Sequence, residues 1–377
     1  MKRRHARPLL TPRLTVTEWS RGEAGNPSTP PITLVWHISD PAERDWIHFL
    51  LRGAVDSELT DLEFTLPRSK AIHVVSSNTH PLMSLDSYFR ACRKRVGSLV
   101  LIHLSDEWFS GGYRLYGNFD QVFRTHHTWL ARSAGVLTIP LGYPNSESAW
   151  PRPKPASARE YAWSFVGEVK ASRPEMIAAM RSIEPHVARD TRPGRSIGSE
   201  RLSKEAYDRL LFESAFSPCP MGNVMLETWR VYESLEAGAI PLIERRLSMD
   251  YYRDLLGEHP MPTFRSWDTA AQFCRGLLAD PAALDSLQSA VVAWWGAKKD
   301  VVRADVLECL RQPSSQSTLR DFALQPANRS AAIFEPLRLV ELVRHQTARG
   351  LLRRLRGPRA IVRRIRRDHQ SSTLPRR

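Results

Sequence analysis

Short apolar runs alternate with amphipathic segments along most of this 377-residue chain. Each run is bounded by polar or turn-forming residues, and the segments between the runs carry apolar residues at helical spacing. This alternation is typical of parallel β-sheets whose two faces are covered by helices. It predicts strands at 32–38, 71–76, 98–104, 161–166, 215–216 and 239–243, and helices at 46–51, 88–95, 174–183, 204–213, 225–237, 264–278 and 281–310.

A proline-rich stretch at 151–159 divides this pattern into two halves, each long enough to bury its own core. We therefore predict an α/β protein with two Rossmann-like parallel-sheet domains, at 31–150 and 160–312, that face a cleft. A loosely held arm at 1–30, a linker at 313–336 and an arginine-rich tail at 337–377 complete the predicted organisation.

The segment 214–244 is the most informative part of the second half. Its first apolar run stops at Pro218 and Pro220, a turn follows at Gly222–Asn223, and a helical pattern continues to Gly238. The next apolar run completes a strand–turn–helix–strand unit of a parallel sheet. Open sheets of this kind bind ligands at the carboxyl ends of their strands.

The predicted helix of this unit carries Glu227, Arg230 and Glu233 at a spacing of three, which places them on one helix face. The preceding turn can present backbone N–H groups to an anion, and an arginine offers a planar fork for phosphate oxygens. A carboxylate one turn further on can accept hydrogen bonds from ribose hydroxyls. The unit therefore predicts a site for a nucleoside diphosphate, and the alternative is a solvated helix face with ion pairs.

The order of residues through this unit resembles the donor-binding segment of exostosin-like glycosyltransferases. The matching positions are Tyr207, Leu211, Ser214, Phe216, Cys219–Pro220, Gly222, Arg230, Glu233, Gly238 and Ile240–Pro241, while Ala239 stands where that family usually has cysteine. The resemblance implies a GT-B hexosyl- or pentosyltransferase that uses a nucleotide sugar without a metal, with Arg230 and Glu233 facing the donor. The chain lacks the N-terminal membrane anchor of animal members, so we expect a bacterial-like member.

Further candidate donor-binding residues lie at neighbouring strand ends. Gly167 and Arg173 flank a strand-to-helix turn that approaches the donor phosphates in the resembled enzymes, and Glu244 ends the last apolar strand. A plain turn with a solvated arginine, and a helix-capping acid, are the alternatives for these positions. The full predicted donor set is Gly167, Arg173, Ser217, Pro220, Gly222, Asn223, Glu227, Arg230, Glu233 and Glu244.

Candidate catalytic residues follow the strands of the first domain. Asp106 and Glu107 come directly after the strand at 98–104, at the edge where parallel sheets bind ligands, and His126 lies in the next polar cluster. A reaction that inverts the anomeric carbon requires such a group to deprotonate the acceptor, whereas a retaining reaction does not. The adjacent His126 and His127 would point to opposite faces of a strand, so we predict no metal site and no cofactor.

The net charge of +14 is concentrated at the end of the chain. Residues 337–377 contain 13 arginines, no lysine and two acids, so the rest of the chain is close to neutral. The tail pattern predicts a basic amphipathic helix that adsorbs to an anionic membrane surface, with phosphate-backbone binding and a solubilising tail as alternatives. The near-neutral body argues against a nucleic-acid partner.

The remaining sequence features concern compartment and competing functions. Four widely spaced cysteines form no paired motif, and no apolar run reaches the length of a transmembrane helix or signal core. We therefore expect a cytoplasmic protein, peripheral at the inner face of the membrane, that glycosylates a glycan or lipid-linked polysaccharide precursor. The competing functions are a noncatalytic protein that binds nucleotide sugar or polysaccharide, and a nucleic-acid-binding protein that acts through its tail.

Overall fold

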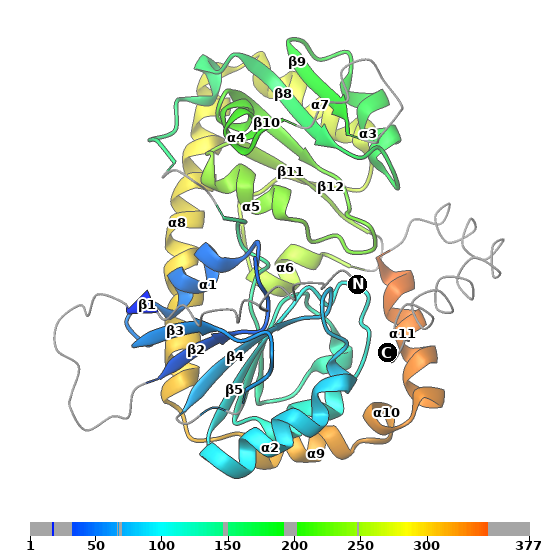
Figure 1. The fold of residues 1–377 in the computed structure, drawn as a ribbon. Helices are drawn as coiled ribbons and strands as arrows, with labels where there is room; N and C mark the ends of the chain where they lie inside the picture. The colour runs from blue at the N-terminus through cyan, green and yellow to red at the C-terminus, as the bar shows by residue number, and fades with distance from the viewer. Residues whose placement is uncertain are drawn as a thin grey trace, which may run out of the picture.

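The computed structural model describes residues 17–18, 32–65, 67, 70–145, 150–191, 202–246 and 249–345. The chain builds two α/β units, each around its own sheet, with one long helix running beside both (Figure 1). Within the described ranges, no helix has the length and apolar composition that a membrane span requires. Most of the predicted arm at 1–30 and the tail beyond residue 345 lie outside the described residues.

The first sheet has seven strands in the order β1-β3-β2-β4-β5-β6-β7, and only its edge strand β1 is antiparallel. Its central strands β4 and β5 are buried at every position, because helices cover both faces. The short polar strand β3 lies where the hydrophobic pattern predicted none. The bounds are β1 Thr17–Glu18, β2 Thr33–Trp36, β3 Ser57–Thr60, β4 Ala71–Ser76, β5 Leu99–Leu104, β6 Gln121–Arg124 and β7 Val136–Thr138, with helices α1 Arg44–Leu51 and α2 Asp86–Val96 and short 3₁₀ turns at Leu82–Leu85, Tyr113–Asn118 and Trp129–Ala131.

The second sheet has five parallel strands in the order β12-β11-β10-β8-β9. Strand β10 continues through Pro218 to Cys219, which a proline tolerates here because the ladder to β8 ends at Phe216. Strand β9 lies where the hydrophobic pattern predicted no strand. The bounds are β8 Tyr161–Gly167, β9 His186–Asp190, β10 Ser214–Cys219, β11 Ile240–Glu244 and β12 Thr263–Phe264, with helices α3 Arg173–Met180, α4 Lys204–Phe212, α5 Trp229–Glu236, α6 Tyr251–Leu256 and α7 Trp267–Leu278 and a 3₁₀ turn at Ala156–Ala158. The two parallel sheets confirm the predicted fold class.

The topology of each sheet fixes where a ligand is expected. In the second sheet the chain leaves β8 toward β9 on one side and continues with β10 on the other, so the strand order reverses between β8 and β10. The first sheet has the same reversal between β2 and its neighbours β3 and β4. Ligands of open α/β sheets bind outside the carboxyl ends of the strands at such switch points.

Helix α8, Pro281–Arg311, ties the two units together. Near its start, Gln288 donates to the carbonyl of Gly238 in the second unit, and further along Arg303 donates to the carbonyl of Arg52 in the first. Midway, the ring of Trp295 packs between Trp46 of the first unit and Tyr232 of the second. The two units therefore share one continuous hydrophobic core at their junction.

The prediction that 313–336 is a linker is wrong, because this stretch forms helices that pack on the first unit. These are α9 Gln316–Leu324, α10 Pro326–Arg329 and the start of α11 Ala331–Arg344. Leu319 of α9 is fully buried and packs against Gly135, which has no side chain to block its approach. Few residues of this stretch are buried and many are polar, so the sequence pattern gives no clear helical signal.

Asp120 holds this C-terminal layer in place. Its carboxylate accepts two hydrogen bonds from Arg93, at 2.7 and 3.0 Å, and one from the N–H of Leu99 at 2.7 Å, and it also accepts from the hydroxyl of Ser314. Burial alone would raise the pKa of Asp120, but the hydrogen bonds from Arg93, Ser314 and Leu99 lower it below its ordinary value.

Replacement of Asp120 by alanine should lower the free energy of unfolding by about 3 kcal/mol at neutral pH, because the partly buried guanidinium of Arg93 and the N–H of Leu99 lose their acceptor. A depressed pKa in the folded state means that this contribution is present above the unfolded-state pKa of about 4 and is lost as the pH falls through the folded value. Urea denaturation of wild type and variant from neutral to acidic pH measures the difference. Asp321→Ala, at an exposed position on α9, is the control; a deficit that did not shrink in acid would contradict the assignment.

Candidate functional site

Several of the predicted donor-binding residues come together at the carboxyl edge of the second sheet. Gly167 ends β8, Met221 and Gly222 follow β10, and Glu244 ends β11. These strands are parallel neighbours, so their ends meet at the switch point between β8 and β10. We call this group, together with Arg173, Tyr207, Arg230 and Glu233, the candidate donor site.

Arg230 lies in the first turn of α5 and is held over the end of β8. Its Nη2 donates to the carbonyl of Val166 at 2.5 Å, its Nη1 donates to the hydroxyl of Tyr207 at 3.0 Å, and its guanidinium lies 4.4 Å from the centre of the Phe165 ring. The side chain is half-buried. Its planar group is therefore oriented by neutral partners, and it forms no ion pair among the residues that the structure describes.

Arg173 brings a second guanidinium to the same place from the start of α3. It donates to the carbonyl of Glu168 at 2.7 Å and lies across the end of β8 from Arg230. A side chain at Gly167 would come within 2.9 Å of Arg230 Nη2 and 3.7 Å of Arg173 Nη1, so the glycine lets both guanidinium groups approach the strand end. Burial, and next the charge of Arg230, lower the pKa of Arg173 to about 10.

These two residues, which we call the arginine pair, form a positive centre at the end of β8. Across the described part of the chain neither of them forms an ion pair with a carboxylate. Like charges at close range repel, and a bound anion would relieve that repulsion. The arrangement fits an anion with several oxygens, such as a diphosphate.

Tyr207 of α4 links the arginine pair to Glu233. Its hydroxyl accepts from Arg230 and donates to Glu233 Oε2 at 3.0 Å. Burial is the main reason that the pKa of Glu233 is raised. The structure thus joins Arg230 and Glu233 on one face of α5, as predicted. It also adds Tyr207, which was not among the predicted site residues. The signal that could have found it is its helical spacing from buried Leu211.

The position predicted for Glu227 is wrong. Helix α5 begins at Trp229, because Thr228 is extended, with φ −142° and ψ 150°. Glu227 therefore precedes the helix and points into the junction between the two units. Its carboxylate accepts from the N–H of Leu141 at 2.8 Å and from the hydroxyls of Tyr232 and Tyr251, both at 2.6 Å.

Electrostatics support this role of Glu227 at the junction. His126 Nδ1 of the first unit lies 3.4 Å from Glu227 Oε2. Burial alone would raise the pKa of Glu227, but His126 and the two tyrosine hydroxyls lower it below its ordinary value. Glu227 is thus an ionised acceptor that joins the units, and it lies apart from the arginine pair.

The loop after β10 is also arranged differently from the prediction. The N–H of Gly222 donates to the carbonyl of Met225, and the N–H of Met221 donates to Glu244, so neither of these N–H groups is available to a phosphate. Glu244 also accepts from the Ser172 hydroxyl at 2.6 Å and pairs with Arg246 at 2.7 Å. Glu244 therefore positions the loops that carry Arg173 and Gly222.

The other residues of the predicted donor set have different surroundings. Ser217 and Pro220 are buried, and the Ser217 hydroxyl has no hydrogen-bond partner among the described residues. Asn223 is exposed and reaches across the junction to Glu107, with Nδ2 3.3 Å from Oε1. Cys219 is buried, which raises the pKa of its thiol to about 12 and fits a packing role.

Asp106 has the surroundings of a structural residue. Its carboxylate accepts from the N–H and hydroxyl of Ser110, from Tyr113 at 2.6 Å and from Arg124 at 3.1 Å. Both Asp106 and Arg124 are fully buried, and Arg124 also lies over the Tyr113 ring. All the acceptor positions of Asp106 are thus occupied, so we no longer assign it proton transfer.

Glu43 is a candidate that the sequence interpretation missed. It follows β2, at the same sheet edge as Glu107 and His126, and it is 4% exposed. Its Oε1 accepts from the Ser105 hydroxyl at 3.3 Å, and burial raises its pKa. The rule that selected Asp106, a carboxylate soon after a parallel strand, would also have selected Glu43.

Unusual backbone conformations gather at the same edges. Ser105 after β5 and His126 after β6 have positive φ angles of 59° and 65°, and Ala171, in the loop before Arg173, has a φ of 52°. Each such residue costs of order 1–3 kcal/mol and persists only where its surroundings impose it. Both facing edges are therefore held in defined conformations.

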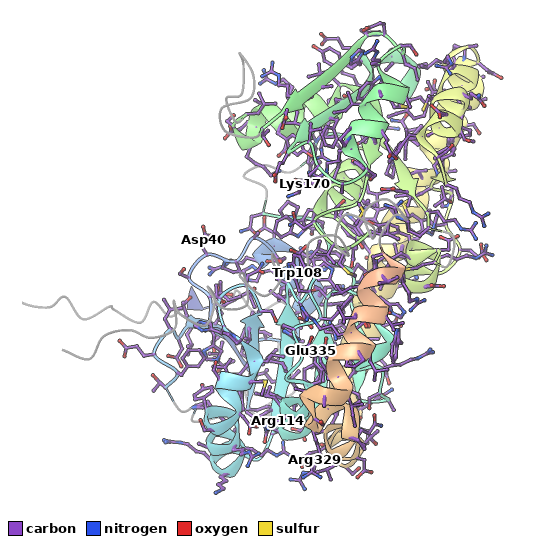
Figure 2. All side chains as sticks on the ribbon, turned by 90° about the vertical axis from the view of Figure 1, so that its right-hand side faces the viewer. Asp40, Trp108, Arg114, Lys170, Arg329 and Glu335 are labelled. Atoms are coloured by element: carbon purple, nitrogen blue, oxygen red, sulfur yellow. The ribbon has the colours of Figure 1, made fainter. Side chains whose placement is uncertain are left out.

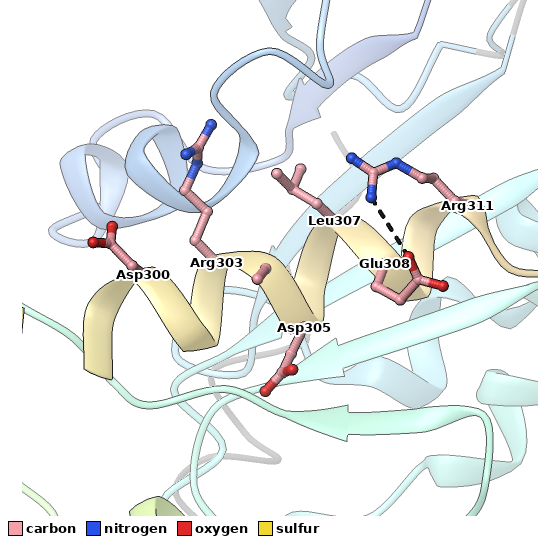
Figure 3. A pocket seen from close by; sticks show the side chains of 7 residues that line it. Asp300, Arg303, Asp305, Leu307, Glu308 and Arg311 are labelled. Atoms are coloured by element: carbon pink, nitrogen blue, oxygen red, sulfur yellow. Dashed lines mark hydrogen bonds and ion pairs between the residues drawn. The ribbon is translucent and has the colours of Figure 1, made fainter. Parts of the chain in front are cut away.

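Other features of the surface carry no comparable chemistry. Within the described ranges, no group of three or more His, Cys, Asp or Glu side chains is arranged to hold a metal ion. A shallow hollow beside α8 is lined by side chains of mixed charge, among them Arg311 and Glu308, which pair at 3.5 Å (Figure 3). It lies on a different part of the molecule from the arginine pair.

Comparison with known proteins gives the following likenesses. The family model described as the RXYLT1 C-terminal domain matches residues 142–269, which include every strand of the second sheet. No curated protein gave a match. Among solved structures, an α1,3-fucosyltransferase is 13% identical with a TM-score of 0.43, and the alignment covers 77% of this chain and 93% of the fucosyltransferase.

A second solved protein is also similar. Anabaena Alr3699/HepE in complex with UDP and glucose is 11% identical with a TM-score of 0.47, over 74% of this chain and 99% of that one. Its complex with UDP-glucose gives 10% identity and a TM-score of 0.43, over 75% and 99% of the two chains.

Because Glu227 joins the two units, Glu227→Ala should lower the free energy of unfolding by about 3 kcal/mol while leaving nucleotide affinity within about twofold of wild type. Thermal unfolding and calorimetric titration of the folded variant with UDP and the other nucleoside diphosphates measure the two effects. The control is Glu258→Gln, whose exposed carboxylate pairs with exposed Arg253. A Glu227→Ala variant with unchanged stability but no nucleotide binding would contradict this assignment and place Glu227 among the donor-binding residues.

Proposed function

We propose that this protein is a glycosyltransferase that transfers a sugar from a nucleotide-sugar donor to a glycan or lipid-linked polysaccharide acceptor. The observation that carries the proposal is the arginine pair, two half-buried guanidinium groups without a carboxylate partner in the described structure. They lie at the switch point of a parallel sheet, where such folds bind nucleotides. The resemblance of this segment to exostosin-like enzymes supports the same activity.

The arginine pair would bind the donor diphosphate and stabilise the leaving group. Negative charge grows on the diphosphate as the bond from the anomeric carbon to its oxygen breaks, so fixed positive groups there stabilise the transition state more than the ground state. Arg230 is oriented by Val166 and Tyr207, and Arg173 by Glu168, before any ligand binds. In this proposal the charge of the pair makes a metal ion unnecessary.

Glu233 would bind the ribose hydroxyls. Its Oε2 is fixed by Tyr207, which also contacts Arg230, so the ribose and diphosphate subsites are coupled through one hydroxyl. Among the described residues only Oε2 of this carboxylate accepts a hydrogen bond, so Oε1 remains able to accept from the nucleoside.

The acceptor would bind at the facing edge of the first sheet. Glu43 and Glu107 are two carboxylates there that form no ion pair within the described part of the chain, and Glu107 already contacts Asn223 of the second unit. For an inverting reaction we propose Glu43 as the base that takes the proton of the attacking hydroxyl. A raised pKa suits that task, because the carboxylate is then a stronger base at neutral pH.

A noncatalytic protein that binds a nucleotide sugar is the competing function, since it would need the arginine pair and not the first-domain carboxylates. Transfer activity distinguishes the two. We further propose that the protein acts in the cytoplasm, at the inner face of the membrane, where nucleotide sugars and lipid-linked precursors meet.

Arg230→Ala should weaken the binding of the preferred nucleoside diphosphate by about 10- to 100-fold, as expected for the loss of charged hydrogen bonds to phosphate. A thermal-shift panel of nucleoside diphosphates and nucleotide sugars detects this, because a ligand that binds only the folded state raises the melting temperature. The variant without ligand should unfold close to the wild-type temperature, since the repulsion from Arg173 is removed.

The control for this panel is Arg209→Ala, an exposed arginine on α4 in the same unit. It should keep the full ligand-induced shift. A wild-type protein that responds to no nucleotide, or an Arg230→Ala variant that responds as wild type does, would contradict the proposed donor site.

Glu43→Gln should reduce the transfer rate by about 10²–10⁴-fold while the affinity for the donor stays unchanged. The wild-type rate should fall with decreasing pH through a pKa above that of an ordinary carboxyl group, because the base must be deprotonated. Glu107→Gln serves as the matched variant and should retain most activity. If Glu107→Gln were inactive and Glu43→Gln active, the base would be Glu107.

A further inference from the structure

Helix α11 presents an apolar stripe to the solvent. Its large hydrophobic residues Ile333, Leu339, Val340 and Val343 are 44%, 54%, 55% and 43% exposed, and Pro336 between them is also exposed. Ile333, Pro336, Val340 and Val343 recur at intervals of three and four, so they share one face of the helix. We call Ile333, Pro336, Leu339, Val340 and Val343 the α11 stripe.

The opposite face of α11 is firmly packed on the body. Phe334 packs on Gly111 and the Tyr113 ring, Arg338 donates to the carbonyl of Trp108 at 2.8 Å, and His345 is fully buried beside Phe109 and Tyr251. The helix is therefore fixed with the stripe outward. Figure 2 shows helix α11 on the side toward the viewer, with Trp108 above Glu335.

The sequence that follows supplies the charge that the stripe itself lacks. Arg338 and Arg344 of α11 are paired with Glu335 and Glu341. Immediately after the helix, residues 346–377 contain eleven arginines and a single acid, with leucine, isoleucine and valine between them. An apolar helix face followed by clustered arginines is the combination that binds the interface of an anionic bilayer.

We infer that the α11 stripe is a docking surface for an anionic lipid bilayer. A second copy of the chain fits the surface less well, because docking stripe to stripe would bring two strongly cationic segments together. The stripe lies on the helix that holds the loop of Trp108 and Glu107, so docking would place the proposed acceptor edge beside the lipid surface. The docking itself does not rest on the proposed transfer reaction, since it needs neither donor nor acceptor.

Co-sedimentation of the full chain with vesicles tests this inference. The wild type should bind vesicles of phosphatidylcholine mixed with phosphatidylglycerol and not vesicles of phosphatidylcholine alone. The triple variant Leu339→Ser, Val340→Ser, Val343→Ser should bind the anionic vesicles about tenfold more weakly, because the apolar contact is lost. The matched control is Leu62→Ser, Met83→Ser, Val301→Ser, which changes equally exposed residues elsewhere and should bind as wild type.

A second measurement does not depend on the triple variant being folded. A polarity-sensitive dye on Val340→Cys should shift its emission to the blue with anionic vesicles, whereas the same dye on Val301→Cys should not. Wild-type affinity of the triple variant, or no shift at position 340, would overturn the inference and leave the tail alone as the membrane-binding element. A dye shift that appeared on self-association without vesicles would assign the stripe to a second copy instead.

Discussion

The relation between the two units depends on the buried carboxylate of Glu227. It is an ionised group without solvent contact, and it is tolerable there only because an N–H, two tyrosine hydroxyls and the nearby His126 surround it. The N–H and the histidine belong to the first unit or the connection that leaves it, and the tyrosines belong to the second. Moving the units apart would expose these donors and leave the charge without its partners, so the carboxylate sets the position of one sheet edge against the other.

The arginine pair shows the opposite arrangement of charge. At the junction a buried anion is surrounded by donors, whereas at the end of β8 two cations are held by carbonyls and a tyrosine and form no direct ion pair with a carboxylate of the described chain. The charge of Glu227 is thus balanced within the protein, whereas the arginine pair keeps the capacity that the proposed donor site requires. This difference separates a residue that joins the two units from the residues of the proposed donor site, although Glu227 and Arg230 are only three positions apart in the sequence.

Sequence patterns predicted the two parallel sheets, because buried strands such as β4 and β5 are continuous apolar runs. They also placed Arg230, Glu233, Gly167 and Arg173 at one sheet edge, which the structure brings together. They failed where contacts between distant segments decide the local structure. Thr228 takes an extended conformation, so Glu227 precedes the helix. The polar stretch after α8 forms helices that pack on Gly135 and are held by Asp120. Strands β3 and β9 were missed because their polar, partly exposed residues give no apolar run.

The two acidic positions at the first sheet edge illustrate how surroundings divide one chemistry into two roles. Asp106 faces Arg124, and the pKa of this carboxyl is lowered despite full burial because His103, Arg124 and Tyr113 stabilise its charge. Glu43 is buried to a similar degree, and burial outweighs the stabilisation of its charge by its own backbone N–H, Ser105 and His126, so its pKa is raised. A carboxylate whose negative charge is already stabilised by several donors gains little from binding a proton. A buried carboxylate with weaker stabilisation binds a proton more readily. The proposed proton transfer is therefore assigned to Glu43 and not to Asp106, although Asp106 lies closer to the end of its strand.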